Sequence, residues 1–373
     1  MIINALEIRY RALEGTNTRT RRLAYISAII KIIGTTDVSR IGILTRLLDW
    51  SESNRRFLHD FWADSGEVTQ TSSNSSAHRY LDLVVGLGLA TQTAGIFRLT
   101  RMGLVLYALI RECSRSNPFF LSDAEEIFFL YWLLRIDADP LLTVIDILLE
   151  MPDARLAYVQ ERYQNNLIQR LSTKLSLSKD ELVQRDLLDR KYFIQDKWKS
   201  PKRYVEHIVP PRLNWLLDIE FFEPGLFRHH QFHFMKSGEE FLSKLPTLGD
   251  TNLHDVSDHW LDTEFWHAAG SFIDKPNQLR LWDETNPQAE IDLYVSRYLE
   301  RAFSAFRHTM VPKISLTQAL IYIVVSLLAN QRIVLSPSSL SKWLETPKVF
   351  SNRQYEVRYS PRENERYLIA RSV

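Results

Sequence analysis

Three groups of side chains in this sequence have the types and spacing that bind metal ions or activate water. In the first group, His229, His230 and His233 are close enough along the chain to supply imidazole ligands for zinc or nickel. No carboxylate stands beside them, and neighbouring residues of a strand point to opposite faces. The cluster is therefore better explained as a polar hairpin than as a metal site.

The second group is an acidic stretch between His254 and His267. Helical spacing would place some of its side chains on one face, namely Asp255, Asp258, His259 and Asp262. Oxygen ligands gathered in this way suit a divalent cation. A solvated helix start explains the same residues with fewer assumptions, because carboxylates are favoured near the positive end of the helix dipole.

The third group, Asp283, Glu290 and Asp292, resembles the acidic half of a nuclease site of the restriction type. In that arrangement a lysine follows the second acid after one intervening residue, but here Leu293 and Tyr294 follow Asp292. The chain also has no Gly-x-x-x-x-Gly-Lys phosphate loop, no Gly-x-Gly-x-x-Gly motif and no Gly-x-Ser-x-Gly elbow. The sequence therefore predicts a protein that is not an enzyme and that needs no metal or other cofactor.

The composition is that of a globular, mainly helical chain. Of its 373 residues 45% are hydrophobic and 12% aromatic, with 12 glycines and 14 prolines, which argues against disorder and against an all-β protein. This length suggests more than one domain. The net charge of +1 leaves only local patches to attract nucleic acid. Cys113 is the single cysteine, and the longest apolar run, residues 316–329, is too short to span a bilayer, so we expect a cytoplasmic protein without a membrane partner.

The elements that would position functional side chains are clearest in residues 77–109. Apolar side chains three and four apart give residues 78–86 one buried helical face. Strand-like residues stand on both sides of a turn at 91–95, and Thr100 can cap a second helix. The segment is expected to fold as helix, hairpin and helix.

This order of elements resembles the winged helix-turn-helix superfamily. The resemblance rests on residues 87–89 (LGL), which lead into the hairpin, and on residues 99–103 (LTRMG), which end it and begin the next helix. It implies a small domain with a recognition helix and a wing, and hence a DNA or protein partner.

The same parts recur later in the chain, in residues 211–245. Residues 219–221 (IEF) correspond in position to residues 87–89 (LGL), and residues 232–238 (FHFMKSG) correspond to residues 97–103 (FRLTRMG). Two such patterns in one chain predict tandem winged-helix domains.

The expected fold class is mainly α with small β hairpins, as tandem winged-helix domains joined by a helical connector. The expected domains are an N-terminal winged helix (1–115), a helical connector (116–180), a second winged-helix-like domain (181–250) and a C-terminal helical domain (251–373). The last domain holds a candidate third winged unit, with a hairpin after a helix that begins near Ser336. The helix-turn-helix pattern before this hairpin is less regular than in the other two units, so the sequence alone does not decide whether a third winged unit is present.

Polar residues near the expected recognition helices and wings are the candidate DNA contacts. They are Ser75, Ser76, His78, Arg79, Arg98, Arg101, Lys202, Arg203, Arg212 and Asn214. The expected partners are double-stranded DNA and other protein subunits. The expected function is that of a regulator or accessory subunit of a prokaryotic DNA-processing or defence complex, by analogy of fold. The alternative is a protein scaffold whose winged helices do not contact DNA.

Overall fold

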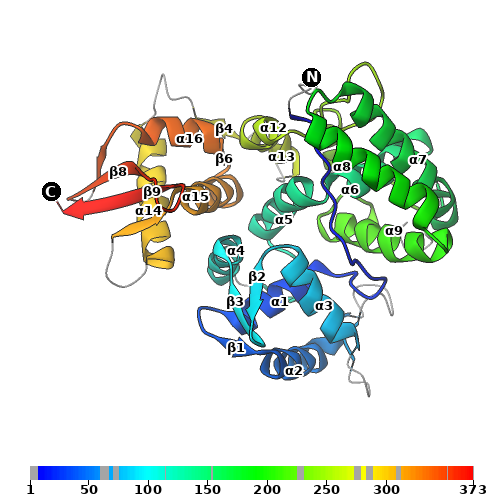
Figure 1. Ribbon diagram of the computed structural model, residues 1–373. Helices are drawn as coiled ribbons and strands as arrows, with labels where there is room; N and C mark the ends of the chain where they lie inside the picture. The colour runs from blue at the N-terminus through cyan, green and yellow to red at the C-terminus, as the bar shows by residue number, and fades with distance from the viewer. Residues whose placement is uncertain are drawn as a thin grey trace.

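The computed structural model describes residues 7–58, 67–69, 75–113, 115–152, 154–224, 231–272, 279–282, 289–307, 312–350 and 352–372. The expectation of a mainly helical protein with small antiparallel hairpins is confirmed, and three groups of elements are arranged around a central helix, α5 (Asp123–Ile136) (Figure 1). Within the described part of the chain no helix is long and apolar enough to cross a membrane.

The first group lies at the bottom of Figure 1 and contains the N-terminal helices and a small sheet. Its elements are α1 (Leu23–Ile33), β1 (Val38–Ser39), α2 (Arg40–Leu58), α3 (Ser75–Gly86), β2 (Ala90–Thr93), β3 (Ile96–Leu99) and α4 (Arg101–Glu112). The strands form an antiparallel sheet in the order β1-β3-β2. The helix, hairpin and helix expected in residues 77–109 are therefore present, although α3 begins at Ser75 rather than at His78.

The second group, green in Figure 1, is helical. Its elements are α6 (Ala138–Glu150), α7 (Leu156–Leu177), α8 (Glu181–Tyr192), the π-helix η2 (Phe193–Lys197), α9 (Pro201–Asp218) and α11 (Lys236–Leu242). Among the described residues of the expected second hairpin, an antiparallel bridge joins Phe222 to Phe234, with backbone hydrogen bonds from Glu223 to His233 and from Met235 to Phe221 on either side. A further bridge joins Arg155, directly before α7, to Gln231. Helices α6, α7 and α9 pack on one another.

Helices α3 and α9 end with the same backbone hydrogen bond. The amide of Leu89 donates to the carbonyl of Val84 at 3.1 Å, and the amide of Phe221 donates to that of Leu216 at 2.9 Å. Both bonds reach back five residues and close the helix end over the first residue of the following extended segment. The recurrence in residues 211–245 that the sequence indicates is therefore also a recurrence of backbone geometry.

The helices that follow the two hairpins, α4 and α11, each have in their first turn a glycine that lies against the backbone of a corresponding residue. A Cβ atom on Gly103 would lie 1.9 Å from the carbonyl oxygen of Leu89, and one on Gly238 would lie 3.1 Å from that of Phe221. The first distance excludes any side chain, and the second leaves little room for one. Glycine at these two positions lets α4 and α11 approach the preceding strand.

The third group contains the C-terminal helices and the largest sheet. Its elements are α14 (Ala289–Phe306), β5 (Lys313–Ser315), α15 (Leu316–Gln331), α16 (Pro337–Leu344), β7 (Lys348–Phe350), β8 (Arg353–Ser360) and β9 (Glu365–Ser372). The sheet order is β5-β9-β8-β7, so the short strand before α15 pairs with the second strand of the hairpin, as β1 pairs with β3. The third group thus shares the order helix, short strand, helix, helix and hairpin with the first, with β6 (Ile333–Val334) and β7 as additional strands.

One hydrophobic core runs through the three groups. The apolar run at residues 316–329 is the buried helix α15, which packs against α4, α5 and α14. Short elements connect the second and third groups, namely α12 (Asp258–Asp262), α13 (Phe265–Ala269), η3 (Gly270–Phe272) and the parallel pair of β4 (Arg280–Leu281) with β6 (Ile333–Val334). Asp218 at the end of α9 accepts the amide of Leu23 at 2.8 Å, which ties the second group to α1.

Candidate nucleic-acid interface and a buried charge network

The helix α3 has one buried and one solvent-facing side. Its buried residues are Ala77, Tyr80, Leu81, Leu83 and Val84. Arg79 and Asp82 are exposed, while Ser75, Ser76 and His78 at the first turn are partly exposed. The solvent-facing side of the helix therefore carries Arg79 and Asp82, with three partly exposed polar residues at its beginning.

The buried side of α3 is fixed by Tyr80. Its hydroxyl oxygen accepts the amide of Arg22 at 2.9 Å, and its ring lies 4.8 Å from the ring of Tyr25 on α1. Burial raises the pKa of the Tyr80 hydroxyl well above its ordinary value, so the group stays neutral. These contacts hold the exposed face of α3 in one orientation.

Most of the positive charge beside α3 is already paired with acids. Arg40 contacts Asp82 at 2.8 Å, and Arg98 on β3 makes two hydrogen bonds of 2.5 Å to Asp37, which lower the pKa of that carboxyl. Arg79 makes no ion pair with any residue that the structure describes.

Arg101, at the start of α4, is also paired. It forms an ion pair with Glu365 of β9 and lies 3.4 Å from the hydroxyl of Tyr367. This arginine therefore joins the first and third groups, and its guanidinium is turned toward the C-terminal sheet.

The candidate residues of the second group divide into two pairs. Lys202 and Arg203 are exposed in the first turn of α9. Arg212 and Asn214 are buried, with 1% and 5% of their surfaces exposed, so the prediction that they contact DNA is wrong. The last turns of α9 pack against α6 and α7, and a side chain enclosed there cannot reach a duplex.

The buried polar groups of α9 are satisfied inside the protein. Arg212 donates to both oxygens of Asp137 at 2.7 and 2.8 Å, and Asn214 donates to the carbonyl of Pro210 at 2.7 Å. Burial raises the pKa of Asp137, against the opposing effect of the Arg212 guanidinium. The pair has a structural role.

The carboxylates of the acidic stretch have cationic partners. Asp255 contacts Lys174 at 3.0 Å, Asp258 pairs with Arg9, and Asp262 lies 3.2 Å from Arg135. Among the described residues no group of three or more histidines, cysteines or acids is arranged to hold a metal ion.

The other two candidate metal groups fall partly outside the described residues. His229, His230 and Asp283 lie outside them, as does the side chain of Glu290. His233 and Asp292 are described.

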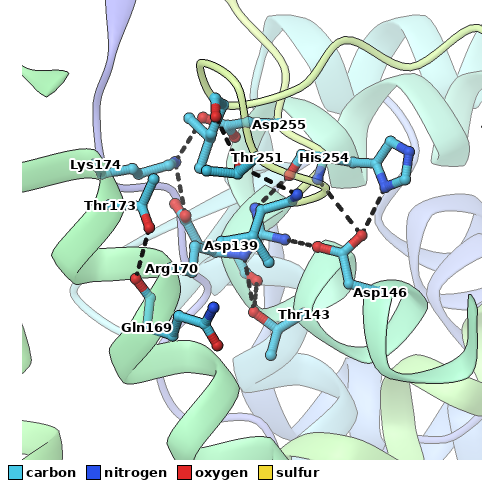
Figure 2. Close-up of polar contacts among 12 residues, drawn as sticks. Asp139, Thr143, Asp146, Gln169, Arg170, Thr173, Lys174, Thr251, His254 and Asp255 are labelled. Carbon is cyan, nitrogen blue, oxygen red and sulfur yellow. Dashed lines mark hydrogen bonds and ion pairs between the residues drawn. The ribbon is translucent and has the colours of Figure 1, made fainter. Parts of the chain in front are cut away.

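The most extensive polar arrangement was not expected from the sequence (Figure 2). Lys174 on α7 points between Asp139 and Asp255, with its ammonium 2.6 and 3.0 Å from their carboxylates. One turn earlier, Arg170 pairs with Asp146, which also lies 2.7 Å from Nδ1 of His254. The four ionic side chains that α6 and α7 contribute to this network, Asp139, Asp146, Arg170 and Lys174, are almost fully buried.

A signal for this network was present in the spacing of α7. Arg170 and Lys174 are four residues apart, and they lie on the same helical face as the buried residues Tyr163, Leu167 and Leu171. Two cations on an apolar face require acidic partners in the folded protein, because an unpaired buried charge is too costly.

The network also holds the N-terminal segment in place. The amide of Arg11 donates to Asp139 at 2.7 Å, the amide of Leu13 donates to Asp137 at 2.8 Å, and Lys174 donates to the carbonyl of Arg9 at 2.9 Å. Residues 9–13 are therefore bound across the beginning of α6 by buried carboxylates.

A scan against protein-family models and a search of curated proteins both found no match to this chain.

Proposed function

We propose that this protein is a non-catalytic, DNA-associated regulator or accessory subunit, built from three winged-helix units. The first unit, α1 to α4, supplies the proposed contact with double-stranded DNA. Two observations support the fold assignment: the order of elements and the pairing of the short strand with the second strand of the hairpin.

The order helix, short strand, helix, helix, hairpin is that of a winged helix. It occurs in α1 to β3 and, with β6 and β7 as additional strands, in α14 to β9. The second unit is more divergent. In it α6, the bridge at Arg155, α7 and α9 take the corresponding places, with α8 and η2 inserted before the last helix.

The observation that carries the DNA proposal is the exposed N-terminal half of α3. Ser75, Ser76, His78 and Arg79 face solvent there, and the β2–β3 hairpin follows α3 directly. A helix N-terminus favours an anion because its amides and its dipole are directed at it. A hydroxyl, an imidazole and a guanidinium around that end add donors for phosphate oxygens.

The charges in this region set the strength of the proposed binding. With Arg40 and Arg98 in ion pairs and Asp82 on the exposed face of α3, only a few phosphates would be neutralised. Binding to a duplex without a specific site should therefore be weak, with a Kd on the order of micromolar or above, and should fall steeply with salt.

Fluorescence anisotropy of a labelled duplex, titrated with the protein at several salt concentrations, tests this proposal. Arg79→Glu should weaken binding at least about fivefold and reduce the salt slope by about one. Arg185→Glu, on the exposed face of α8, makes the same change of charge in another unit and should leave affinity within about twofold. Equal affinity of Arg79→Glu and the wild type would refute the assignment of α3.

The ion pairs of Arg40, Arg98 and Arg101 favour a second candidate, a protein scaffold. Winged-helix units whose positive charges are already neutralised can dock proteins instead of DNA. No duplex binding by the wild type even in low salt would support the scaffold. Native mass measurement of the protein purified from its own cell would then identify whether protein subunits accompany it.

A further inference from the structure

The second unit contains a cavity of about 480 Å³ beneath the N-terminal segment. This volume lies within the range of small-molecule sites, about 300–1,000 Å³. The cavity is bounded by residues 10–16, α7, α8, η2 and α9. None of its lining residues belongs to α3, so any ligand in it would bind away from the proposed DNA contact.

Aromatic side chains form much of the cavity lining, namely Tyr10, Tyr163, Phe193, Trp198 and Tyr204. The rings of Trp198 and Tyr204 are stacked, with centroids 5.0 Å apart and planes 10° from parallel. Flat surfaces of this kind favour a flat ligand, because stacked rings bury a large area with little loss of conformational freedom.

One of the lining residues, Tyr163 of α7, has a polar group without a partner among the described residues. The side chain of Tyr163 is completely buried, and its hydroxyl makes no hydrogen bond with any described residue. Burial also raises the pKa of this hydroxyl, so it remains a proton donor. Buried polar groups are almost always satisfied, and an acceptor atom on a ligand would satisfy this one.

The charged groups around the cavity are already neutralised by one another. Arg212 is paired with Asp137. Arg190 is paired with Glu14, and its guanidinium lies over the ring of Tyr10. A charged ligand would find no unpaired counter-ion among these groups, and its burial would be costly. The cavity therefore suits an uncharged molecule.

The surrounding backbone is held in place rather than open to collapse. The buried carboxylates of Asp137 and Asp139 fix residues 11–13, which form one side of the cavity. On the opposite side the π-helix η2 brings Phe193 and Ile194 to the lining. Insertions of this type in helices often occur at functional sites.

We propose that this cavity binds an uncharged, flat aromatic molecule that carries a carbonyl or similar acceptor, and that the hydroxyl of Tyr163 donates a hydrogen bond to it. Such a ligand would stack along Trp198 and Tyr204 and would be enclosed by the N-terminal segment. The second unit then serves as a small-molecule site, consistent with the burial of the last turns of its helix α9.

Titration of the full chain with prodan, a neutral naphthyl ketone whose emission shifts to the blue in an apolar site, tests this inference. Saturable binding of one equivalent with a blue shift is expected. Tyr163→Phe keeps the ring and removes the donor, and should weaken binding at least about fivefold. Ile208→Trp on α9, a partly buried lining residue, should fill the cavity and abolish binding.

Two control variants separate this site from other binding. Tyr158→Phe makes the same change on α7 outside the cavity lining and should bind like the wild type. Leu182→Ser removes an exposed apolar side chain of α8 and should also leave binding unchanged. Circular dichroism establishes that each variant is folded.

Three results would overturn the inference: no saturable binding by the wild type, equal binding by Tyr163→Phe and Ile208→Trp, or loss of binding in Leu182→Ser. The first would mean that the cavity does not accept this class of molecule, and the others would place the probe elsewhere. None of them depends on DNA binding by α3.

Discussion

Replacement of Lys174 by methionine tests the central contact of the buried network. The ammonium is fully buried, lies 2.6 Å from Asp139 and 3.0 Å from Asp255, and donates to the carbonyl of Arg9. Methionine fills a similar volume but leaves two buried carboxylates without this counter-ion. Removing one partner of a buried ion pair costs about 3–5 kcal/mol. Because Asp139 keeps the amide of Arg11, we expect a loss near 3 kcal/mol, at the lower end of that range.

Urea denaturation followed by circular dichroism measures this loss in the free energy of unfolding. Arg162→Met is the matched control, since this residue is exposed on the same helix, and it should change stability by no more than about 0.5 kcal/mol. Adding Asp255→Asn to Lys174→Met removes one uncompensated charge and should restore part of the loss. A loss below about 1 kcal/mol in Lys174→Met would refute the reasoning, because the pair would then contribute no more than a surface ion pair.

Two further predictions concern stability. Gly103→Ala should destabilise the protein by at least about 2 kcal/mol, because its Cβ would lie 1.9 Å from the Leu89 carbonyl oxygen, while Gly238→Ala should cost less at 3.1 Å from that of Phe221. Thermal unfolding compares the two, and an unchanged Tm for Gly103→Ala would contradict the close approach. Glu126→Gln should stabilise the protein at pH 8 and have little effect at pH 4. Burial raises the pKa of Glu126 in the folded state. The free energy of unfolding is therefore unaffected by this group at low pH, where the carboxyl is protonated in both states, and falls as the pH rises from the ordinary glutamate pKa through the raised one. An equal effect of Glu126→Gln at both pH values would argue against this cause.

The helix, hairpin and helix of the first unit could be predicted from the sequence, because the residue patterns that indicate them are local. Apolar side chains at helical spacing, a turn between two short strands and the cap at Thr100 all act within a few residues of one another. The hydroxyl of Thr100 does accept the amide of Gly103, at 3.1 Å. The same kind of signal indicated the recurrence in residues 211–245, where an antiparallel bridge joins Phe222 to Phe234.

The beginning of α3 was less well determined. The apolar spacing indicates a helix from His78, but Ser75 and Ser76 already belong to the first turn of α3. Serine is favoured at a cap and is also tolerated inside a helix, so residue type alone does not fix the boundary.

The sequence by itself determined which segments are helices and hairpins, and it determined that charges would be balanced overall. Only the tertiary structure decided which charged side chains are buried. Arg212 and Asn214 carry polar groups that are usually exposed, yet Asp137 and the carbonyl of Pro210 satisfy them inside the protein. Likewise Lys174 is enclosed because Asp139 and Asp255 meet it from other segments. Burial of a charge is possible only where a partner compensates for lost hydration, and that partner is brought near by the fold rather than by the neighbouring sequence.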